Sequence, residues 1–543
     1  MKNGENYRGS SRRTFLKGIA ASLLLVPFIN SCKRHVAAII VKLTGTNHIL
    51  GHRLWAKNFP KSSSIIEIPY LIIGAGITGL SAARQLQKKG IPDFLIIELE
   101  NHAGGNSSNG ENSYSKYPLG AHYLPLPNFH DKELLSFLEE EHIITGYDAK
   151  GFPVFDEEQL CFSPQERLYY KNNWQEGLIP KFGNTDELDA EFNRFFKLME
   201  TFRDAKGSDA KYFFDIPISA ISTDASYRYL DALTMQQWLN NNGFKHPEVH
   251  EYINYCCRDD YGLGHAYVSA WAGIHYFSGR KHNNGDTKDS VLTWPEGNAR
   301  LASHLKKYAK DKFLLNHLAF SITNNNNNVL IEAFDDVKKQ TVTIIANKVI
   351  MATPQFVNQY LLPERKQFTS HFNYAPWLLA TLTLTDLPGD YNYPLCWDNV
   401  IFKGNGLGYI YDQQQSLLQI QNKKVITFYH SFSTASSNKA RKEIYSKPKA
   451  YWEAFALADL KRAHPGIENY VEDIHIHLLG HGMISPVPGF IFGNAKHEAS
   501  RNIDNTIYFA HSDLSGISIF EEAFHQGINV VNTLLKDAAT LDT

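Results

Sequence analysis

The spacing of apolar residues predicts a β-α-β unit close to residue 70. Tyr70 to Ile73 is a continuous apolar run with the length of a buried strand. Apolar residues then recur at a helical period, which predicts a helix over residues 80–89. A second apolar run, Phe94 to Ile97, predicts the next buried strand. Two buried strands joined by a helix are typical of a parallel sheet, so the pattern indicates an α/β fold.

Six residues, Gly74 to Gly79, join the first strand to the helix and include three glycines. Gly74 permits a tight turn, Gly76 lets the backbone approach a pyrophosphate, and Gly79 allows close packing of the helix on the sheet. Free N–H groups at the start of the helix favour an anionic ligand. Glu98 ends the second strand about 20 residues later, where it can accept hydrogen bonds from ribose hydroxyls. The unit therefore predicts dinucleotide binding, and Glu98 disfavours NADP because it would repel a 2'-phosphate.

The downstream pattern predicts a second domain inserted into the first. Aromatic-rich helical stretches fill residues 130–285. Strand-like stretches return at Trp377–Leu384, Gly408–Tyr411, Lys424–Tyr429 and Glu472–Leu479. We therefore expect a nucleotide-binding domain in several pieces, with a substrate domain of helices and strands between them.

Motifs outside the β-α-β unit indicate the cofactor by resemblance. Gly104-Gly105-Asn106 and Gly120-Ala121-His122-Tyr123 follow Glu98. Further motifs lie at Thr293–Asn298, Leu315–Ala319, Val349–Pro354 and Thr506–Gly527. Together they resemble the signature of the superfamily that contains flavin-containing amine oxidases, phytoene desaturases and protoporphyrinogen oxidases. Asn106 stands where this superfamily usually has an arginine.

The resemblance implies a Rossmann-like FAD-binding domain of the glutathione-reductase type with an inserted α+β substrate domain. We expect the FAD-binding domain in residues 65–128, 286–356 and 490–540, and the substrate domain in residues 129–285 and 357–489. It also implies non-covalent FAD, with Asp513 binding ribityl hydroxyls and a helix start facing the flavin. The predicted cofactor contacts are Gly74, Ala75, Gly76, Ile77, Thr78, Gly79, Glu98, Leu99, Gly104, Gly105, Asn106, Gly120, Ala121, His122, Tyr123, Leu318, Asp513, Ile519 and Phe520.

The sequence does not identify the catalytic residues. The resemblance implies an FAD-dependent oxidoreductase that transfers a hydride from a small-molecule or lipidic substrate to flavin N5. Leu379 aligns with the lysine that amine oxidases place near N5, and Ile519 aligns with the second aromatic wall of their amine cage. These departures disfavour ordinary amine oxidation with oxygen. An amine oxidase remains an alternative, as does a flavin module that only passes electrons to a partner.

The candidate pocket residues are Tyr123, Arg258, His275, Tyr374 and Trp377. Each has a simpler structural explanation, as a core aromatic residue, a helix-end ion pair or a buried histidine. Asp473, His475 and His477 alternate along a predicted strand and so share one face, which leaves a metal site as a minor alternative to ordinary strand positions. We predict no metal.

Residues 1–32 resemble a twin-arginine export signal. Arg12-Arg13 precedes the apolar run Gly18–Ile29, and Cys32 ends the run at the position of a lipidated cysteine, with ordinary cleavage nearby as the alternative. We therefore expect export by the twin-arginine machinery, to the periplasm or to a membrane-anchored lipoprotein form. Residues 33–64 are expected to be a tether with a short segment of unassigned role.

Charge and cysteine spacing disfavour a nucleic-acid partner and a zinc site. The formal net charge of −2 does not favour nucleic acid as a partner. Four further cysteines have no zinc-site spacing, and we interpret them as small buried apolar residues, namely Cys161, Cys256, Cys257 and Cys396.

Overall fold

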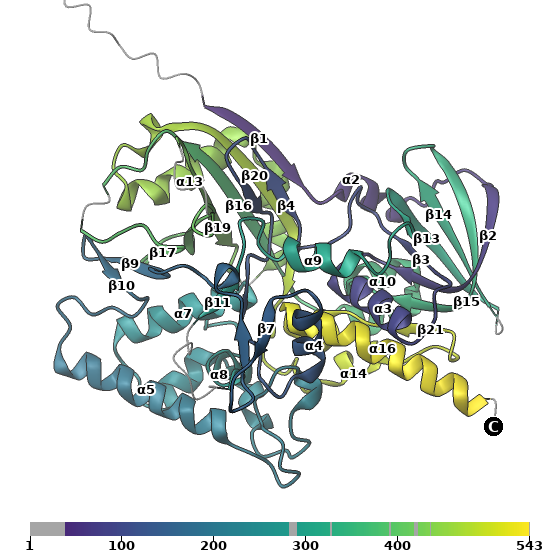
Figure 1. Cartoon of the computed structure of the whole chain (residues 1–543), viewed down its shortest axis with the longest axis horizontal. Helices are drawn as coiled ribbons and strands as arrows, with labels where there is room; N and C mark the ends of the chain where they lie inside the picture. Colours follow the sequence, from purple (N-terminus) through teal and green to yellow (C-terminus); the bar gives the residue numbers. More distant parts are fainter. Residues whose placement is uncertain are drawn as a thin grey trace, which may run out of the picture. The chain divides into compact units, whose positions relative to one another are not determined.

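The computed structural model describes residues 39–541, apart from 282–289, 326–327, 390–391, 417–421 and 435. The predicted export signal, including Cys32, lies outside the described residues. Two large sheets organise the described chain, one of seven strands and one of eight (Figure 1). Helices pack on both, which confirms the α/β class predicted from the sequence.

The seven-stranded sheet contains the predicted β-α-β unit. Strands β2 (Ser62–Ile73) and β3 (Phe94–Ile97) are parallel neighbours, and α3 (Ile77–Lys88) connects them. The sheet has the order β12-β3-β2-β15-β14-β13, with β21 beside β15. Its other strands are β12 (Phe313–Leu314), β13 (His317–Asn324), β14 (Val329–Asp335), β15 (Gln340–Met351) and β21 (Ile507–Phe509).

The last helix, α16 (Phe520–Leu541), lies along α3 (Figure 1). A Cβ on Gly527 would lie 2.4 Å from the Thr78 carbonyl oxygen, so only glycine permits this approach. The Ser81 hydroxyl also donates to the Phe524 carbonyl oxygen at 2.7 Å. The first turn of α3 and the C-terminal segment are therefore held together.

Seven strands of the eight-stranded sheet lie in residues 129–285 and 357–489, the region predicted as the substrate domain, whereas β1 lies outside it. Its order is β1-β20-β16-β19-β18-β17-β9-β10. Its strands are β1 (Ile40–Gly45), β9 (Glu166–Tyr170), β10 (Asn173–Glu176), β16 (Tyr374–Leu384), β17 (Asp398–Ile401), β18 (Gly408–Tyr411), β19 (Lys424–Ser431) and β20 (Val471–Ile484).

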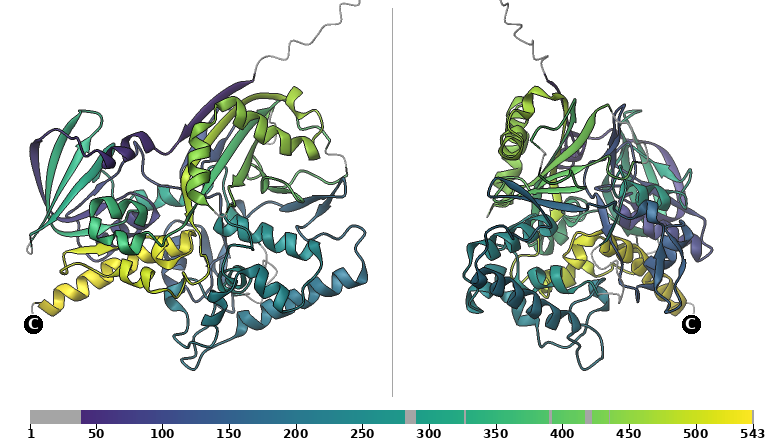
Figure 2. Two further views of the ribbon diagram at one scale, coloured as in Figure 1. Left: turned by 180° about the vertical axis from the view of Figure 1, so that it is seen from behind. Right: turned by 60° about the vertical axis from the view of Figure 1, so that its left-hand side comes forward.

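Helices cover both faces of this sheet (Figure 2). On one face, α5 (Asp186–Asp204), α7 (Pro247–Tyr261) and α8 (Ala270–Ser278) form an aromatic core that includes Tyr429 of β19. On the other face, the ring of the neighbouring Phe428 lies 6.5 Å from that of Phe455 in α13 (Lys449–Ala463). The alternation of side chains along a strand thus places consecutive residues in different layers.

The remaining elements are shorter or cover the sheets. They are α2 (His48–Gly51), η1 (His52–Trp55), β4 (Asn109–Glu111), β5 (Lys116–Pro118), β6 (Tyr123–Pro125), α4 (Lys132–Glu140), β7 (Ile144–Tyr147), β8 (Pro153–Phe155), η2 (Glu157–Gln159), η3 (Ile218–Ala220), η4 (Arg228–Ala232), α6 (Met235–Asn241), β11 (Val291–Thr293), α9 (Ala299–Lys306), α10 (Gln355–Leu361), η5 (Pro363–Arg365), α11 (Lys366–Thr369), α12 (Ser437–Ser446), η6 (Ile467–Asn469), α14 (Asn494–Ser500) and α15 (Ser512–Ser515).

The segment expected as a tether, residues 33–64, is structured where it is described. Strand β1 pairs in parallel with β20, so it extends the eight-stranded sheet. Leu50 and Leu54, in α2 and η1, are buried in the core of the seven-stranded sheet. The expectation is corrected for residues 40–55, which connect the two sheets. The sequence signal is weak there because both helical elements are single turns and β1 lies at a sheet edge.

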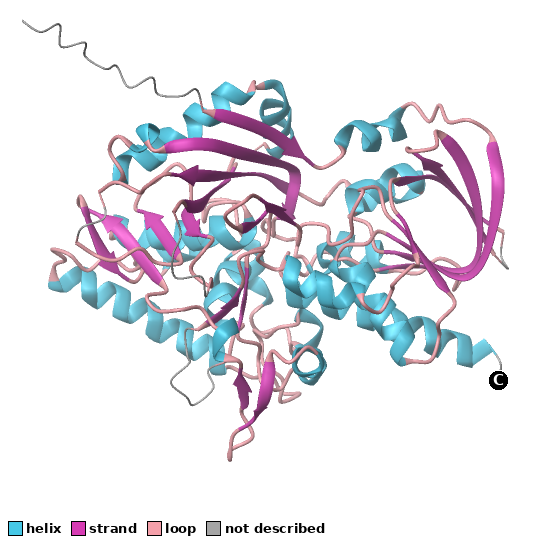
Figure 3. Ribbon diagram, turned by 45° about the horizontal axis from the view of Figure 1, so that its top comes forward, coloured by secondary structure: helices cyan, strands magenta, loops and turns pink. Residues whose placement is uncertain are grey.

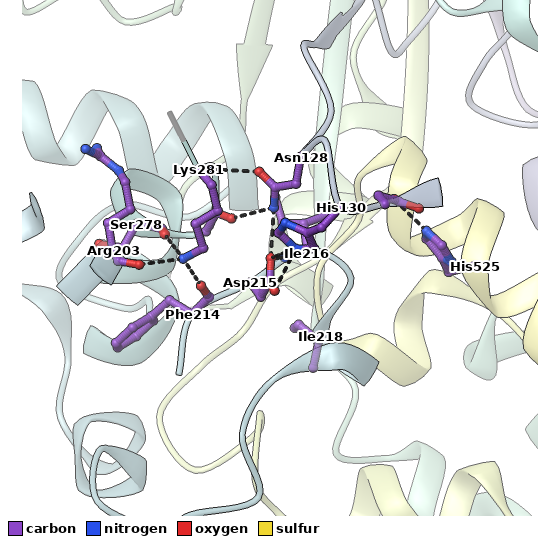
Figure 4. A network of polar contacts seen from close by, with 12 residues as sticks. Asn128, His130, Arg203, Phe214, Asp215, Ile216, Ile218, Ser278, Lys281 and His525 are labelled. Atoms are coloured by element: carbon purple, nitrogen blue, oxygen red, sulfur yellow. Dashed lines mark hydrogen bonds and ion pairs between the residues drawn. The ribbon is translucent and has the colours of Figure 1, made fainter. Parts of the chain in front are cut away.

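A buried polar network joins the loop after β6 to the helices of the substrate region (Figure 4). Asn128 Nδ2 donates to Asp215 Oδ1 at 2.8 Å. Lys281 Nζ donates to the carbonyl oxygens of Arg203 at 2.7 Å and Ser278 at 2.9 Å. The lysine therefore donates to carbonyl groups at the ends of α5 and α8, which would otherwise be buried without a hydrogen-bond donor.

Two further contacts attach α16 to the same region. His525 Nε2 lies 2.7 Å from Asp131 Oδ2, and Glu522 Oε1 accepts a hydrogen bond from the Ile218 N–H at 2.6 Å. The start of α16 is therefore held both to the beginning of α4, through Asp131, and to η3, through Ile218.

Candidate cofactor and substrate site

The glycine turn between β2 and α3 leaves the start of α3 accessible. Gly74 has a φ of +105°, and a Cβ on Gly79 would lie 2.0 Å from the Gly74 carbonyl oxygen. Among the residues that the structure describes, in contrast, nothing lies within 4 Å of a Cβ on Gly76, and no side chain caps the helix there. The first N–H groups of α3 therefore have no intrahelical or capping partner and have room in front of Gly76, as phosphate binding requires.

The Glu98 carboxylate lies beside this turn. Its Oε2 accepts a hydrogen bond from the Ala75 N–H at 2.6 Å, and its Oε1 accepts one from the Glu100 N–H at 2.9 Å. Burial raises the pKa of Glu98 to about 7, against the lowering effect of these N–H groups. Such a carboxylate can accept hydrogen bonds from sugar hydroxyls.

The double glycine brings a second loop against the turn. The Gly104 N–H donates to the Ala75 carbonyl oxygen at 2.9 Å. Gly105 has a φ of +57°, and a Cβ there would lie 3.2 Å from the Cα of Gly76. The loop thus lies beside the open position on Gly76, where the resemblance implies a pyrophosphate.

Asn106, which replaces the usual arginine, makes structural contacts. Its Nδ2 donates to the Gly482 carbonyl oxygen at 2.5 Å, and its own carbonyl oxygen accepts from the Ala121 N–H at 3.0 Å. A Cβ on Gly120 would lie 2.1 Å from that same carbonyl oxygen. Asn106 therefore positions the Gly120–Tyr123 segment, and it brings no cation to a phosphate.

The C-terminal motif places Asp513 beside β16. Its Oδ2 accepts hydrogen bonds from the Tyr374 hydroxyl at 2.6 Å and the Gln355 N–H at 2.9 Å, and its Oδ1 lies 2.9 Å from His511 Nδ1. Burial alone would raise the pKa of Asp513, but these three neighbours lower it. Asp513 is therefore an ionised, buried acceptor of the kind that ribityl hydroxyls require. Tyr374, a predicted pocket residue, lies beside it.

The other predicted contacts complete the fit to FAD. Leu318 on β13 is buried, and Leu99 is half-buried in the same core cluster. Phe520 is the first residue of α16, and Ile519 precedes it. The site thus suits FAD part by part. The N–H donors at the start of α3 suit the phosphates, the acceptors Glu98 and Asp513 suit the ribose and ribityl hydroxyls, and the start of α16 suits the flavin. The assignment of individual contacts stays a prediction.

A cluster of carboxyl groups and tyrosines continues from the Gly120–Tyr123 segment. We call it the acidic cluster, and its members are Asp259, Asp260, Asp398, Tyr123, Tyr255 and Tyr429. Tyr123 hydrogen-bonds Asp259, and the Tyr429 hydroxyl donates to Asp398 Oδ1 at 3.2 Å. Tyr255 also hydrogen-bonds Asp398.

The acidic cluster reaches the start of α16. Asp260 interacts electrostatically with Arg280 and Glu521, whose Nη1 and Oε1 atoms lie 2.6 Å apart. Glu521 follows Phe520, the predicted flavin contact, and Tyr123 belongs to the other segment predicted to lie along the flavin. The cluster therefore lies between two predicted flavin contacts.

Burial keeps these carboxyl groups from ionising together. It raises the pKa of Asp398 to about 7 and that of Asp260 to about 6. The pKa of Asp259 is raised well above its usual value by burial and then by the charges of Asp260 and Asp398. A cation that enters the cluster would stabilise the ionised forms. Carboxyl groups perturbed in this way are typical of functional sites.

The remaining predicted pocket residues make other contacts. Arg258 donates to the Asn405 carbonyl oxygen at 2.5 Å and, with Tyr255, lines a small hollow. His275 Nε2 lies 2.9 Å from the Asp215 carbonyl oxygen, and burial lowers the pKa of this histidine to about 4. Trp377 is buried against Gly262 and Gly482. His275 and Trp377 therefore have the structural roles that were the simpler explanation.

The histidines on β20 contact protein groups. Thr44 Oγ1 of β1 lies 2.7 Å from His475 Nε2 and 2.8 Å from His477 Nδ1, and the Tyr117 hydroxyl lies 2.8 Å from His475 Nδ1. Within the described ranges, no group of three His, Cys, Asp or Glu side chains could hold a metal ion. The histidines instead attach β1 to the sheet.

A further prediction interprets the cysteines as small buried apolar residues. Cys256, Cys257 and Cys396 are buried, Cys161 is half-buried, and all four are free thiols. Among the helices that the structure describes, none is both long enough and apolar enough to span a bilayer.

The chain is similar in sequence to a dinucleotide-binding family and to flavin-containing oxidases. Residues 72–140 match the family model of an NAD(P)-binding Rossmann-like domain. The chain is 22% identical over 336 residues to the probable flavin-containing monoamine oxidase A of Dictyostelium discoideum, a match that covers 59% of this chain and 65% of that protein. It is 29% identical over 96 residues to polyamine oxidase 7 of Oryza sativa, covering 17% of this chain and 20% of that protein. The matches thus span less than two thirds of these relatives.

Solved structures share the fold over most of the chain. Putrescine oxidase bound to putrescine superposes with a TM-score of 0.64 at 15% identity, covering 87% of this chain and 100% of that chain. Cyclohexylamine oxidase from Brevibacterium oxydans gives a TM-score of 0.61 at 15% identity, covering 87% of this chain and 99% of that chain. At this identity the likeness establishes the fold.

Proposed function

We propose that this chain, which resembles flavin-containing amine oxidases in sequence and in fold, is an FAD-dependent oxidoreductase whose substrate is a cationic amine. The acidic cluster is the observation that carries the proposal. Its carboxyl groups, placed between predicted flavin contacts, would bind an ammonium group and offer little to the neutral or lipidic substrates expected more broadly from the sequence. The relatives named as monoamine, polyamine and putrescine oxidases support the same substrate class.

The residues of the cluster would bind and prepare the amine. Bound FAD supplies an acceptor, at flavin N5, for a hydride from the carbon next to the amine nitrogen. Burial raises the pKa of Asp398 to about 7, so its ionised form is suited to take a proton from the substrate ammonium, becoming a neutral carboxyl group and leaving a neutral amine. Tyr123 and Tyr429 hold the carboxyl groups in place through their hydroxyls.

We further propose that oxygen is a slow acceptor of the electrons. Leu379, which aligns with the lysine of amine oxidases, is buried on β16 and pairs with Tyr429 on β19. A leucine brings no charge or proton donor to this position. A quinone or a partner protein would then reoxidise the flavin.

Anaerobic reduction of the purified holoprotein tests the substrate class. A diamine, a monoamine and an alcohol with the same carbon chain are added in turn, and bleaching of the visible flavin band is followed. We expect the amines to reduce the flavin and the alcohol to leave it oxidised. Equal reduction by amine and alcohol would contradict the proposal. Reduction only by a quinol or a reduced partner protein would instead favour an electron-transfer module.

Two variants locate the binding group. Asp398→Asn and Asp259→Asn should weaken amine binding at least about tenfold, because each removes a carboxylate partner of the cation. Asp311→Asn, an exposed acid on a loop, is the matched control and should behave as the parent.

We also propose that the twin-arginine machinery exports the protein with its cofactor already bound, and that Cys32 carries a lipid anchor. The motif Arg12-Arg13 and the apolar run before Cys32 support this. Cell fractionation of the parent and of Arg12→Lys/Arg13→Lys tests the export route. Retention of only the variant in the cytoplasm is expected, and equal export of both would refute it.

A further inference from the structure

We propose that the first described elements form a docking surface for an anionic membrane. We call this surface the basic edge and define it as residues 40–66, from β1 through α2 and η1 to the beginning of β2. It begins as the edge strand of the eight-stranded sheet, passes through α2 and η1, and enters β2 of the seven-stranded sheet (Figures 1 and 3). The inference rests on exposed side chains and is independent of the substrate proposed above.

The charge of this segment is one-sided. Residues 33–66 contain six lysine and arginine residues and no aspartate or glutamate, although the whole chain has a formal net charge of −2. Lys42, Lys57 and Lys61 are exposed, and none lies within ion-pair distance of a carboxylate in the described chain. Such charges are free to bind anionic headgroups. Each lysine near an anionic bilayer contributes about 1 kcal/mol of attraction.

Arg53 of the same segment has a different role. Its guanidinium lies 4.5 Å from the ring centroid of Phe59 and 4.1 Å from that of Phe334. It also donates to the Asn58 carbonyl oxygen at 3.1 Å. Arg53 therefore holds η1 against the seven-stranded sheet, and the three lysines supply the surface charge.

Large apolar side chains are exposed between the lysines. Ile40, Ile49, Trp55 and Ile65 are 72%, 76%, 63% and 67% exposed, respectively. With Leu43, five of the thirteen exposed large hydrophobic residues among the described residues lie between positions 40 and 65. Exposed apolar residues gathered in one segment indicate an interaction surface, whereas single ones do not. Tryptophan beside lysine suits the headgroup region of a bilayer.

The preceding sequence argues for a membrane as the occupant. The apolar run Gly18–Ile29 and Cys32 end eight residues before β1 begins. A chain held at a membrane by this segment would place the basic edge within reach of the headgroups. The same charge pattern fits phospholipid phosphates better than it fits a protein partner with mixed charges.

Vesicle flotation tests the proposal. The chain from Lys33 onward, loaded with FAD, is mixed with vesicles of phosphatidylcholine alone or with 30 mol% phosphatidylglycerol, a composition of roughly the charge that such membranes present. This form lacks the export signal and keeps residues 40–543, which form one unit. We expect binding to the anionic vesicles and loss of binding in 0.5 M salt, where the Debye length falls to about 4 Å.

Matched triple variants separate the basic edge from net charge. Lys42→Glu/Lys57→Glu/Lys61→Glu should weaken vesicle binding at least about a hundredfold. Lys197→Glu/Lys211→Glu/Lys245→Glu changes the same total charge on exposed positions of the helical region and should keep most of the binding. Bound FAD absorbance checks that each variant is folded. Absence of binding by the parent, binding to neutral vesicles at the same strength, or equal losses in both triple variants would overturn the proposal.

Discussion

Replacing Asp398 with asparagine should stabilise the protein and impair its function. Asp398 is 8% exposed, and its pKa of about 7 compares with 3.8 for an unperturbed aspartate. In the unfolded chain it ionises at low pH, whereas in the folded protein it resists ionisation. The fold therefore loses stability as the pH rises from 3.8 to about 7. An asparagine removes this loss, and its Oδ1 can still accept the hydrogen bond from Tyr429.

The size of the effect follows from the shift. The raised pKa of Asp398 lowers the free energy of unfolding by about 1.5 kcal/mol at pH 5 and about 4 kcal/mol at pH 8. An unfolding entropy of about 1.1 kcal/mol/K for a chain of this length converts these values to increases in Tm of about 1.5 °C and 4 °C. Thermal unfolding of the parent and Asp398→Asn at both pH values measures them, with Asp311→Asn as a control. A gain in Tm that is the same at both pH values, or a loss at pH 8, would refute the reasoning.

Three further predictions concern the cofactor site and β1. Gly76→Val should weaken FAD binding about a hundredfold or more, because the valine side chain would fill the position in front of α3. Gly146→Ala, which also adds a Cβ in open space, should leave FAD binding unchanged. A fluorescence titration of the apoprotein with FAD measures both affinities. Glu98→Gln should weaken FAD binding about tenfold at pH 8 and less at pH 6, where Glu98 is itself largely protonated, and a loss independent of pH would contradict its assignment. Thr44→Val should cost about 1–3 kcal/mol of unfolding free energy without altering FAD content, because two buried histidines lose their shared partner, and urea unfolding tests this.

The parts of the fold that could be predicted are those encoded locally. Strand β2, the glycine turn, α3 and β3 are continuous in sequence, so apolar spacing and three glycines indicate them without knowledge of distant contacts. Strand β1 escaped prediction because its partner β20 lies more than 400 residues later. An edge strand with exposed residues on one face carries little periodic signal.

The acidic cluster could not be predicted for a related reason. Its members lie on β6, α7, β17 and β19, which only the tertiary structure brings together. Asp259 and Asp260 offered one signal, as adjacent acids late in a helix whose neighbouring residues are buried cysteines. Asp398, on a short strand of otherwise buried residues, offered none. Tyr123 was predicted because it follows a cofactor motif.

The energetics of the cluster support a functional origin. A carboxyl group whose pKa is raised by burial lowers the stability of the fold, and here the pKa values of three such groups are raised, that of Asp259 also by the charges of Asp260 and Asp398. Each of the three carboxyl groups has a tyrosine hydrogen-bond partner, but Arg280 is engaged with Glu521, so the cluster keeps an excess of negative charge when it ionises. Packing alone would be served better by asparagine or leucine at these positions. An arrangement that costs stability and is completed by a cation is what a binding site for an ammonium group requires, and it lies where the predicted flavin contacts meet.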